Sequence, residues 1–271
     1  MYENNIQNSD TRLIDEALAS EPIKNTFRLG WEFIVVNQKF TLTAMIIFVV
    51  LNLFGMIPVA TLIFMVLSAV FGLVIQIHVG KTFYASQDIK NYIHEIEESS
   101  IDTLLTRHVG TAFGAYIGWV VLLLLVILLF GFVGGSMGII TEHMNKVALL
   151  NALVALGFPI FLIALAFSYV QPLVQSNIIM ANGIQGGFKA VFTIFSTRIW
   201  RMAFQSSYFK YVAGFGLIII LLLFFFAFLI GLLTALSGLA IVGNILMIVL
   251  MYIFMLIMAI GSMMARRSVE F

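Results

Sequence analysis

Few side chains in this sequence have the types and spacing that chemistry requires. His94, Glu98 and Asp102 follow one another at intervals of four, so a helix would bring them to one face. An imidazole and two carboxylates can bind a divalent metal, but protein zinc sites usually include a second histidine or a cysteine. We therefore expect no metal site and no cofactor, and we interpret these residues as part of a solvated acidic face.

The groups that covalent catalysis needs are missing or isolated. The chain has no cysteine, which removes thiolate nucleophiles, thiolate metal sites and disulfides together. It also lacks a phosphate-binding loop, a dinucleotide-binding glycine fingerprint and a His-Glu-x-x-His motif. Within the apolar segments no acidic residue accompanies a serine and a histidine, which argues against an intramembrane protease. We expect a protein that is not an enzyme, and we name no catalytic residue.

The polar residues inside the apolar segments are neutral. No Asp, Glu, Lys or Arg lies in the middle of such a segment, where its charge would be costly and would point to function. This argues against a proton-coupled antiporter, a voltage sensor or an ion pump. The neutral residues could line a path for a solute, or they could hydrogen-bond between helices. The candidates for a solute path are Asn52, Gln76, Asn151 and Asn244.

These residues belong to a chain made mostly of apolar segments. Apolar residues make up 62% of the sequence and charged residues 10%, compared with about 25% charged in a soluble domain. Lipid must therefore be part of its solvent. We predict an all-α polytopic membrane helix bundle with amphipathic helices beside the membrane. Its six transmembrane helices are placed at about 41–57, 59–79, 111–133, 147–170, 211–235 and 240–264.

The basic residues orient these spans. With six spans, 13 of the 14 Lys and Arg residues fall on one side and only Lys146 falls on the other. This distribution predicts a multi-pass protein of the bacterial inner membrane with both termini in the cytoplasm. Because the span at 41–57 is near the minimum length, residues 41–79 form either a full hairpin or a re-entrant one. The segment between the last two spans, 236–239, allows only a tight turn.

Two cytoplasmic segments have the pattern of helices lying in the membrane interface. Residues 1–20 are predicted to be a mobile acidic tail, 21–38 an interfacial amphipathic helix and 39–265 the six-span membrane domain. The alternative for 21–38 is a linker packed on the protein's own surface. Basic and aromatic residues of 21–38 and 172–210 suit anionic lipid headgroups. They are Lys24, Arg28, Trp31, Lys189, Arg198, Trp200 and Arg201.

Residues 85–109 form the one extended cytoplasmic segment with soluble character, and it is acidic. Ser99 and Asp102 resemble a capping pair that starts a second short helix there. The acidic residues could pair with the basic segment at 183–210 or with a protein partner. We predict partner binding by Glu95, Glu97, Glu98 and Asp102. A net charge of +1 argues against binding to nucleic acid.

Small residues at intervals of four mark two faces where helix backbones can approach closely. Each face could form a homo-oligomer interface, or it could pack within one chain. The first face consists of Gly110, Gly114 and Gly118, and the second of Ala227, Gly231 and Ala235.

An interfacial helix, an apolar hairpin and a returning cytoplasmic helix follow one another, with Lys-x-x-Phe stretches at 24–27 and 189–192. This order resembles a group of bacterial six-span inner-membrane proteins of unassigned function. It is also similar to the membrane domain of some glycerophosphodiester phosphodiesterases, whose catalytic domain is missing here. The resemblance supplies no functional residue.

Two hypotheses of function remain. The first is a non-enzymatic scaffold or accessory subunit, and the second is a small-solute transporter or the permease subunit of an ATP-driven exporter. Such permeases usually have a longer re-entrant segment before the last span.

Overall fold

The computed structural model describes residues 12–136 and 146–270, and within these ranges every regular element is helical. The elements are α1 (Leu13–Ala19), α2 (Pro22–Val36), α3 (Gln38–Phe54), α4 (Thr61–Ala85), α5 (Ile89–Glu97), α6 (Ile101–Ser136), α7 (Lys146–Met180), α8 (Gly183–Val191), the 3-10 helix η1 (Phe192–Phe195), α9 (Thr197–Ala203), α10 (Ser206–Ser237) and α11 (Ala240–Arg267). The predicted all-α class is confirmed.

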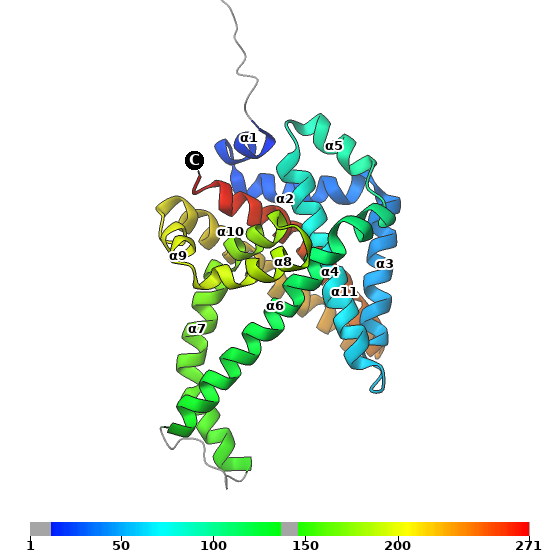
Figure 1. Ribbon diagram of the computed structural model, residues 1–271. Helices are drawn as coiled ribbons and strands as arrows, with labels where there is room; N and C mark the ends of the chain where they lie inside the picture. Colours follow the sequence, from blue (N-terminus) through cyan, green and yellow to red (C-terminus); the bar gives the residue numbers. More distant parts are fainter. Residues whose placement is uncertain (1–11, 137–145, 271) are drawn as a thin grey trace, which may run out of the picture.

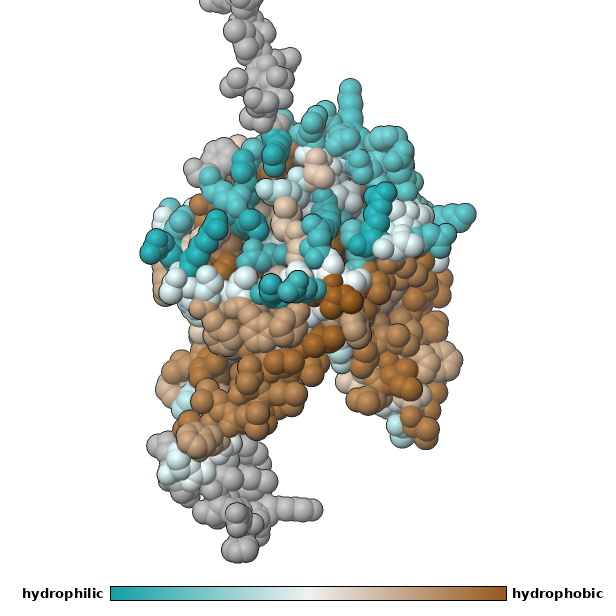
Figure 2. Space-filling model, in the orientation of Figure 1, coloured by the Kyte–Doolittle hydropathy of each residue, from teal (hydrophilic) through white to brown (hydrophobic). Residues whose placement is uncertain are grey.

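The short helices gather at one end of the molecule. Helices α1, α2, α5, α8 and α9 lie beside the upper ends of the long helices (Figure 1). Figure 2 shows that the hydrophilic surface is concentrated at this end and that the long helices below it are hydrophobic. We call this end the charged cap. Because buried charge and water-exposed apolar surface are both unfavourable, the boundary between the two surfaces indicates the edge of the membrane.

Below the cap the long helices separate into two limbs (Figure 1). One limb is the hairpin of α6 and α7, and the other contains α3, α4, α10 and α11. Large apolar side chains cover both limbs, among them Leu128, Phe132 and Phe224, which are 67%, 75% and 73% exposed. The limbs are therefore the part of the chain that lipid must solvate.

Helix α11 is the centre of the bundle. It packs against α1, α2, α3, α4, α7 and α10. In its most apolar stretch 56% of the residues are buried, whereas the figure for α10 is 6%, so α10 is a peripheral helix. The buried Tyr252 of α11 donates a hydrogen bond of 3.2 Å to the carbonyl oxygen of Thr41. This bond joins α11 to α3 inside an otherwise apolar contact.

Five helices of the described chain are long and apolar enough to cross a membrane, namely α4, α6, α7, α10 and α11. The remaining predicted span corresponds to α3, whose 17 residues extend about 26 Å at 1.5 Å per residue. The chain bends by 96° between α2 and α3. Helix α2 therefore lies across the end of α3, which is the orientation expected of an interfacial helix. The multi-pass membrane architecture is confirmed.

The prediction of a mobile acidic tail over 1–20 is wrong for its second half. Residues 13–19 form α1, in which Leu13, Ile14 and Ala17 are buried against the cap. The apolar face of this short helix is partly hidden in the sequence by the acidic residues between its apolar positions. Residues 1–11 lie outside the described part of the chain.

Ser99 and Asp102 do not start a separate short helix. Helix α6 runs unbroken from Ile101 into the membrane-spanning stretch. Its capping side chain is Ser100, whose Oγ accepts a hydrogen bond of 3.2 Å from the N–H of Thr103. Helix α6 therefore extends from the cap into one limb without a break.

The connection between α10 and α11 is the tight turn that the sequence predicts. Gly238 has a φ of +66°, a left-handed conformation that a residue without a Cβ adopts at little cost. Its N–H donates a 3.0 Å hydrogen bond to the carbonyl oxygen of Thr234 and closes the end of α10.

Candidate functional site

The glycine face of α6 packs against α8 of the same chain. A Cβ atom at Gly114 would overlap the carbonyl oxygen of Ile184. The contact is reciprocal, because a Cβ at Gly187 would overlap the carbonyl oxygen of Thr111. Two backbones are therefore in direct contact, which only glycine permits. Gly110, Gly114 and Gly118 thus pack within one chain, which is one of the two alternatives that the sequence left open.

The second small-residue face has a different environment. Ala227 and Ala235 are exposed, and a Cβ at Gly231 would meet nothing within 4 Å among the described atoms. This face does not pack within the described chain. A homo-oligomer contact there stays a prediction.

Helix α2 combines both interpretations of the 21–38 segment. One face is buried through Leu29 and Phe33. The opposite face exposes Lys24, Arg28 and Trp31, the last of these at 59%. Helix α2 is thus packed on the protein's own surface and still presents its predicted headgroup-binding residues outward.

The segment from α8 to α9 exposes a second basic and aromatic surface. Lys189, Arg198 and Arg201 are exposed, and Phe195 and Phe204 are 58% and 77% exposed. Exposed aromatic rings beside cations are typical of the level of lipid headgroups. Trp200 is only partly exposed. Its indole N–H donates a 2.8 Å hydrogen bond to the carbonyl oxygen of Ile194, which holds the ring against η1.

The acidic helix α5 is held on the cap by its apolar face. Tyr92 and Ile96 are buried, and the Tyr92 hydroxyl donates a 3.1 Å hydrogen bond to the carbonyl oxygen of Leu29. Burial, with the Glu32 carboxylate nearby, raises the pKa of Tyr92 above its usual range. The phenol therefore stays a donor at neutral pH.

The predicted partner-binding residues Glu95, Glu97, Glu98 and Asp102 are all exposed. His94 Nε2 lies 3.3 Å from Glu98 Oε1. Helices α5 and α9 lie on different sides of the cap (Figure 1), and no ion pair joins the acidic residues of α5 to the basic residues of α8 and α9 within the described chain. The described residues also contain no group of three or more candidate metal ligands.

Of the four residues proposed for a solute path, the structure brings two together, Asn52 and Gln76. Asn52 Nδ2 donates a 2.7 Å hydrogen bond to Ser68 Oγ and joins α3 to α4. Gln76 accepts one of 2.7 Å from Gln175 and joins α4 to α7. Asn244 is exposed, and the side chain of Asn151 lies outside the described atoms. Asn52, Ser68 and Gln76 line a groove of about 360 Å³, and Asn244 does not.

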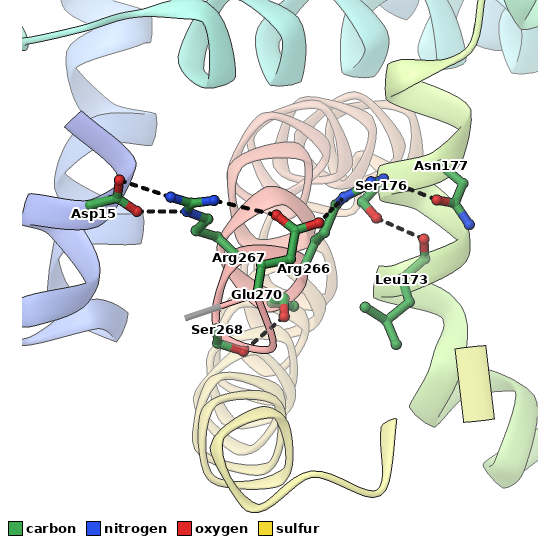
Figure 3. A network of polar contacts seen from close by, with 9 residues as sticks. Asp15, Leu173, Ser176, Asn177, Arg266, Arg267, Ser268 and Glu270 are labelled. Carbon is green, nitrogen blue, oxygen red and sulfur yellow. Dashed lines mark hydrogen bonds and ion pairs between the residues drawn. The ribbon is translucent and has the colours of Figure 1, made fainter. Parts of the chain in front are cut away.

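An ion-pair network at the end of α11 was not predicted from the sequence (Figure 3). Arg267 contacts both Asp15 and Glu270, at 2.6 Å and 3.6 Å. Arg266 donates hydrogen bonds of 3.0 Å to Glu270 Oε1 and to Asn177 Oδ1. The network joins α1, α7 and α11. Two arginines after an apolar span resemble a simple stop signal, and the sequence does not indicate that they have carboxylate partners.

A histidine pair lies where the cap meets the limbs, also without a signal in the sequence. His78 of α4 and His108 of α6 have ring centroids 5.5 Å apart. His78 Nε2 shares a 2.8 Å hydrogen bond with Ser99 Oγ. The buried His108 Nδ1 has no hydrogen-bond partner among the described residues.

Residues 134–138, Gly-Gly-Ser-Met-Gly, have the spacing of the Gly-x-Ser-x-Gly motif of hydrolases. That motif places its serine on a turn between a strand and a helix. Ser136 instead ends α6, and its hydroxyl donates a 3.0 Å hydrogen bond to the carbonyl oxygen of Val133. This context does not support a nucleophile.

Comparisons with known proteins give no further guide to the class. No protein-family model, no curated protein and no solved structure matches this chain.

Proposed function

We propose that this protein is a non-enzymatic scaffold or accessory subunit of the bacterial inner membrane, with both termini in the cytoplasm. Its charged cap binds anionic lipid headgroups through α2, α8 and α9, and a protein partner through α5. The observation that carries the proposal is the separation of charge between two parts of the cap: the exposed acidic residues of α5 and the exposed basic residues of α8 and α9 occupy different helices, and no ion pair joins them within the described chain. Surfaces of opposite sign that do not neutralise each other are available to different partners.

The packing of the chain supports the same proposal. The cap has buried helices, capped ends and ion pairs, whereas only 17% of the most apolar stretch of α6 and 6% of that of α10 is buried. Such long helices act as membrane anchors for the cap. The orientation rests on the distribution of Lys and Arg, 13 of 14 of which fall on the side of the cap.

Reporter fusions and bound lipid test this proposal. Fusions after Phe40, Lys90, Gln205 and Phe271 should report the cytoplasm, and a fusion after Asn145 should report the outside. Full-length protein extracted in mild detergent should retain phosphatidylglycerol in preference to phosphatidylcholine. An external signal at residue 90 or 205, or equal retention of the two lipids, would contradict the orientation or the lipid binding respectively.

The second candidate is a small-solute carrier or an exporter permease. The groove beside Asn52, Ser68 and Gln76 favours it, because neutral polar groups there face a space of about 360 Å³. Against it, two of these residues bond to each other, and the α10–α11 turn leaves no room for a re-entrant segment. Solute flux in liposomes decides between the two candidates.

A further inference from the structure

A small polar pocket opens on the cap between α7, η1, α9 and the end of α11. Its volume is about 290 Å³, just below the range of about 300–1,000 Å³ of drug-sized ligand sites. Such a space suits a headgroup better than a whole lipid. Three apolar residues complete the lining, and its polar residues are Ser176, Asn177, Thr193, Ser196, Arg198 and Arg266.

One of the two guanidinium groups in this lining is held in place. Arg266 donates through Nη1 to Asn177 Oδ1 and through Nε to Glu270 Oε1, both at 3.0 Å (Figure 3). A guanidinium has five N–H donors, so three more remain for a ligand. Asn177 is fixed in turn, because its amide donates a 3.0 Å hydrogen bond to Thr193 Oγ1. The wall of the pocket is therefore formed before a ligand binds.

The second guanidinium belongs to Arg198 of α9 and is exposed. No ion pair to it occurs within the described chain. Its own stretch of the sequence offers no carboxylate, because there is no Asp or Glu between Glu142 and Glu270. Beside it stands Ser196, whose hydroxyl does not cap α9. Arg198 and Ser196 line the same pocket as Arg266 and are available to bind an anion there.

The charge of the surroundings sets the charge of the ligand. Arg198, Arg266 and Arg267 contribute three positive charges, and the network contains two carboxylates, Asp15 and Glu270. One positive charge remains. A phosphodiester carries one negative charge, and its planar recognition by guanidinium groups is favourable. A zwitterionic headgroup would add an ammonium close to the arginines and would be disfavoured.

We propose that this pocket binds the phosphodiester of one anionic glycerophospholipid, such as phosphatidylglycerol. The exposed Phe195 and Phe204 on the neighbouring turns place the pocket at the level of lipid headgroups, so that a membrane lipid reaches it directly. The inference rests on the lipid binding of the proposed function and adds a defined site to it. Diffuse attraction to a charged surface needs no such site.

Full-length protein in nanodiscs provides the test, with bound phosphatidylglycerol counted by native mass spectrometry and its affinity measured by titration. Wild-type protein should retain one tightly bound phosphatidylglycerol and no phosphatidylcholine. Arg198→Ala should weaken that binding by about tenfold or more, because a charge-assisted hydrogen bond to phosphate is lost. Ser196→Ala should weaken it less. Arg107→Ala, which removes an exposed arginine elsewhere on the cap, should leave it unchanged.

The other outcomes are distinguishable. Equal weakening by Arg198→Ala and by Arg201→Ala, which lies on α9 outside the pocket lining, would show diffuse attraction and overturn the pocket while leaving the proposed lipid binding intact. No preference for phosphatidylglycerol in the wild type would contradict both. If inorganic phosphate binds with the same dependence on Arg198 and the lipid does not compete, the pocket takes a soluble phosphate and the lipid assignment is wrong. Unchanged thermal stability of Arg198→Ala excludes misfolding as the cause.

Discussion

Arg267 and Asp15 form a two-point ion pair across 252 positions of the sequence, with Nε–Oδ1 and Nη2–Oδ2 distances of 2.6 and 3.1 Å. The Asp15 side chain is 8% exposed and that of Arg267 is 25% exposed. The pair holds α1, the first described helix, against the end of α11, the last one. It makes the packing of α1 depend on the C-terminal end of the bundle.

Removing either partner should therefore loosen α1. Asp15→Ala or Arg267→Ala should lower the free energy of unfolding by about 1–3 kcal/mol, since the remaining charge is partly buried without its partner and partly screened by solvent. The double variant should lose less than the sum of the two. Thermal unfolding in detergent measures the change, and cleavage by a protease within residues 12–20 reports the release of α1.

Glu16→Ala is the matched control for the ion pair. Glu16 lies on the same helix as Asp15 and is exposed, so its loss should change stability by less than about 0.5 kcal/mol. Equal effects of Asp15→Ala and Glu16→Ala, or strict additivity of the Asp15 and Arg267 variants, would show that the pair does not hold α1.

The glycine face of α6 should tolerate no side chain. Gly114→Leu should destabilise the protein by about 2 kcal/mol or more, because its Cβ would overlap the backbone of α8 and force the two helices apart. Gly131→Leu tests the same change on the same helix at a position where a Cβ meets nothing within 4 Å of the described atoms. Thermal stability should fall for the first variant only. A Gly114→Leu protein as stable as the wild type is incompatible with this contact.

The sequence was sufficient for the all-α class and for the long apolar helices, because hydrophobic length is a property of each segment alone. It was insufficient for the partners of each element. The spacing of Gly110, Gly114 and Gly118 predicts a close helix contact, but α8 as the neighbour follows from the path of the chain. In the same way α1 is stabilised by Arg267, a residue too distant in the sequence for any local pattern to indicate.

Candidate site residues were predictable in type more than in arrangement. The exposure of Lys24, Arg28 and Arg198 follows from the amphipathic pattern of their helices. The pocket between Arg198 and Arg266 could not be foreseen, because it depends on how α7, α9 and α11 meet. Asn52 and Gln76 were identified as polar residues within spans, but their bonds to Ser68 and Gln175 are tertiary.

Charge reversal on α5 should remove a protein partner. The triple variant Glu95→Lys, Glu97→Lys, Glu98→Lys changes three exposed side chains and leaves the buried Tyr92 and Ile96 in place. The three introduced lysines then repel a basic partner surface, and association should weaken by at least tenfold. In-cell cross-linking from position 102 followed by quantitative mass spectrometry measures the change. Lys90→Glu, a reversal of the other sign on the same helix, should preserve every cross-link that the wild type forms.

If the triple variant forms the same cross-links as the wild type, α5 is a solvated helix with no role in recognition. Loss of partners in Lys90→Glu as well would indicate a general disturbance of α5. Circular dichroism and thermal unfolding of both variants separate that disturbance from a local loss of contact.

The neutral polar residues of the spans should matter for stability and have no role in transport. Asn52→Ala removes the 2.7 Å bond to Ser68 and should cost about 0.5–1 kcal/mol, the usual contribution of a hydrogen bond between membrane helices. Asn244→Ala should be neutral, because Asn244 is exposed. No Asp, Glu, Lys or Arg lies in the middle of any span. No carboxylate there can carry a proton or neutralise a cation, so proton or sodium coupling is not expected. Purified protein in liposomes should accordingly move no small neutral solute, and neither variant should alter lipid or partner binding. Solute flux that either Asn52→Ala or Asn244→Ala abolishes would refute the scaffold and establish a carrier, because it would mean that these amides bind a substrate on its way through the membrane.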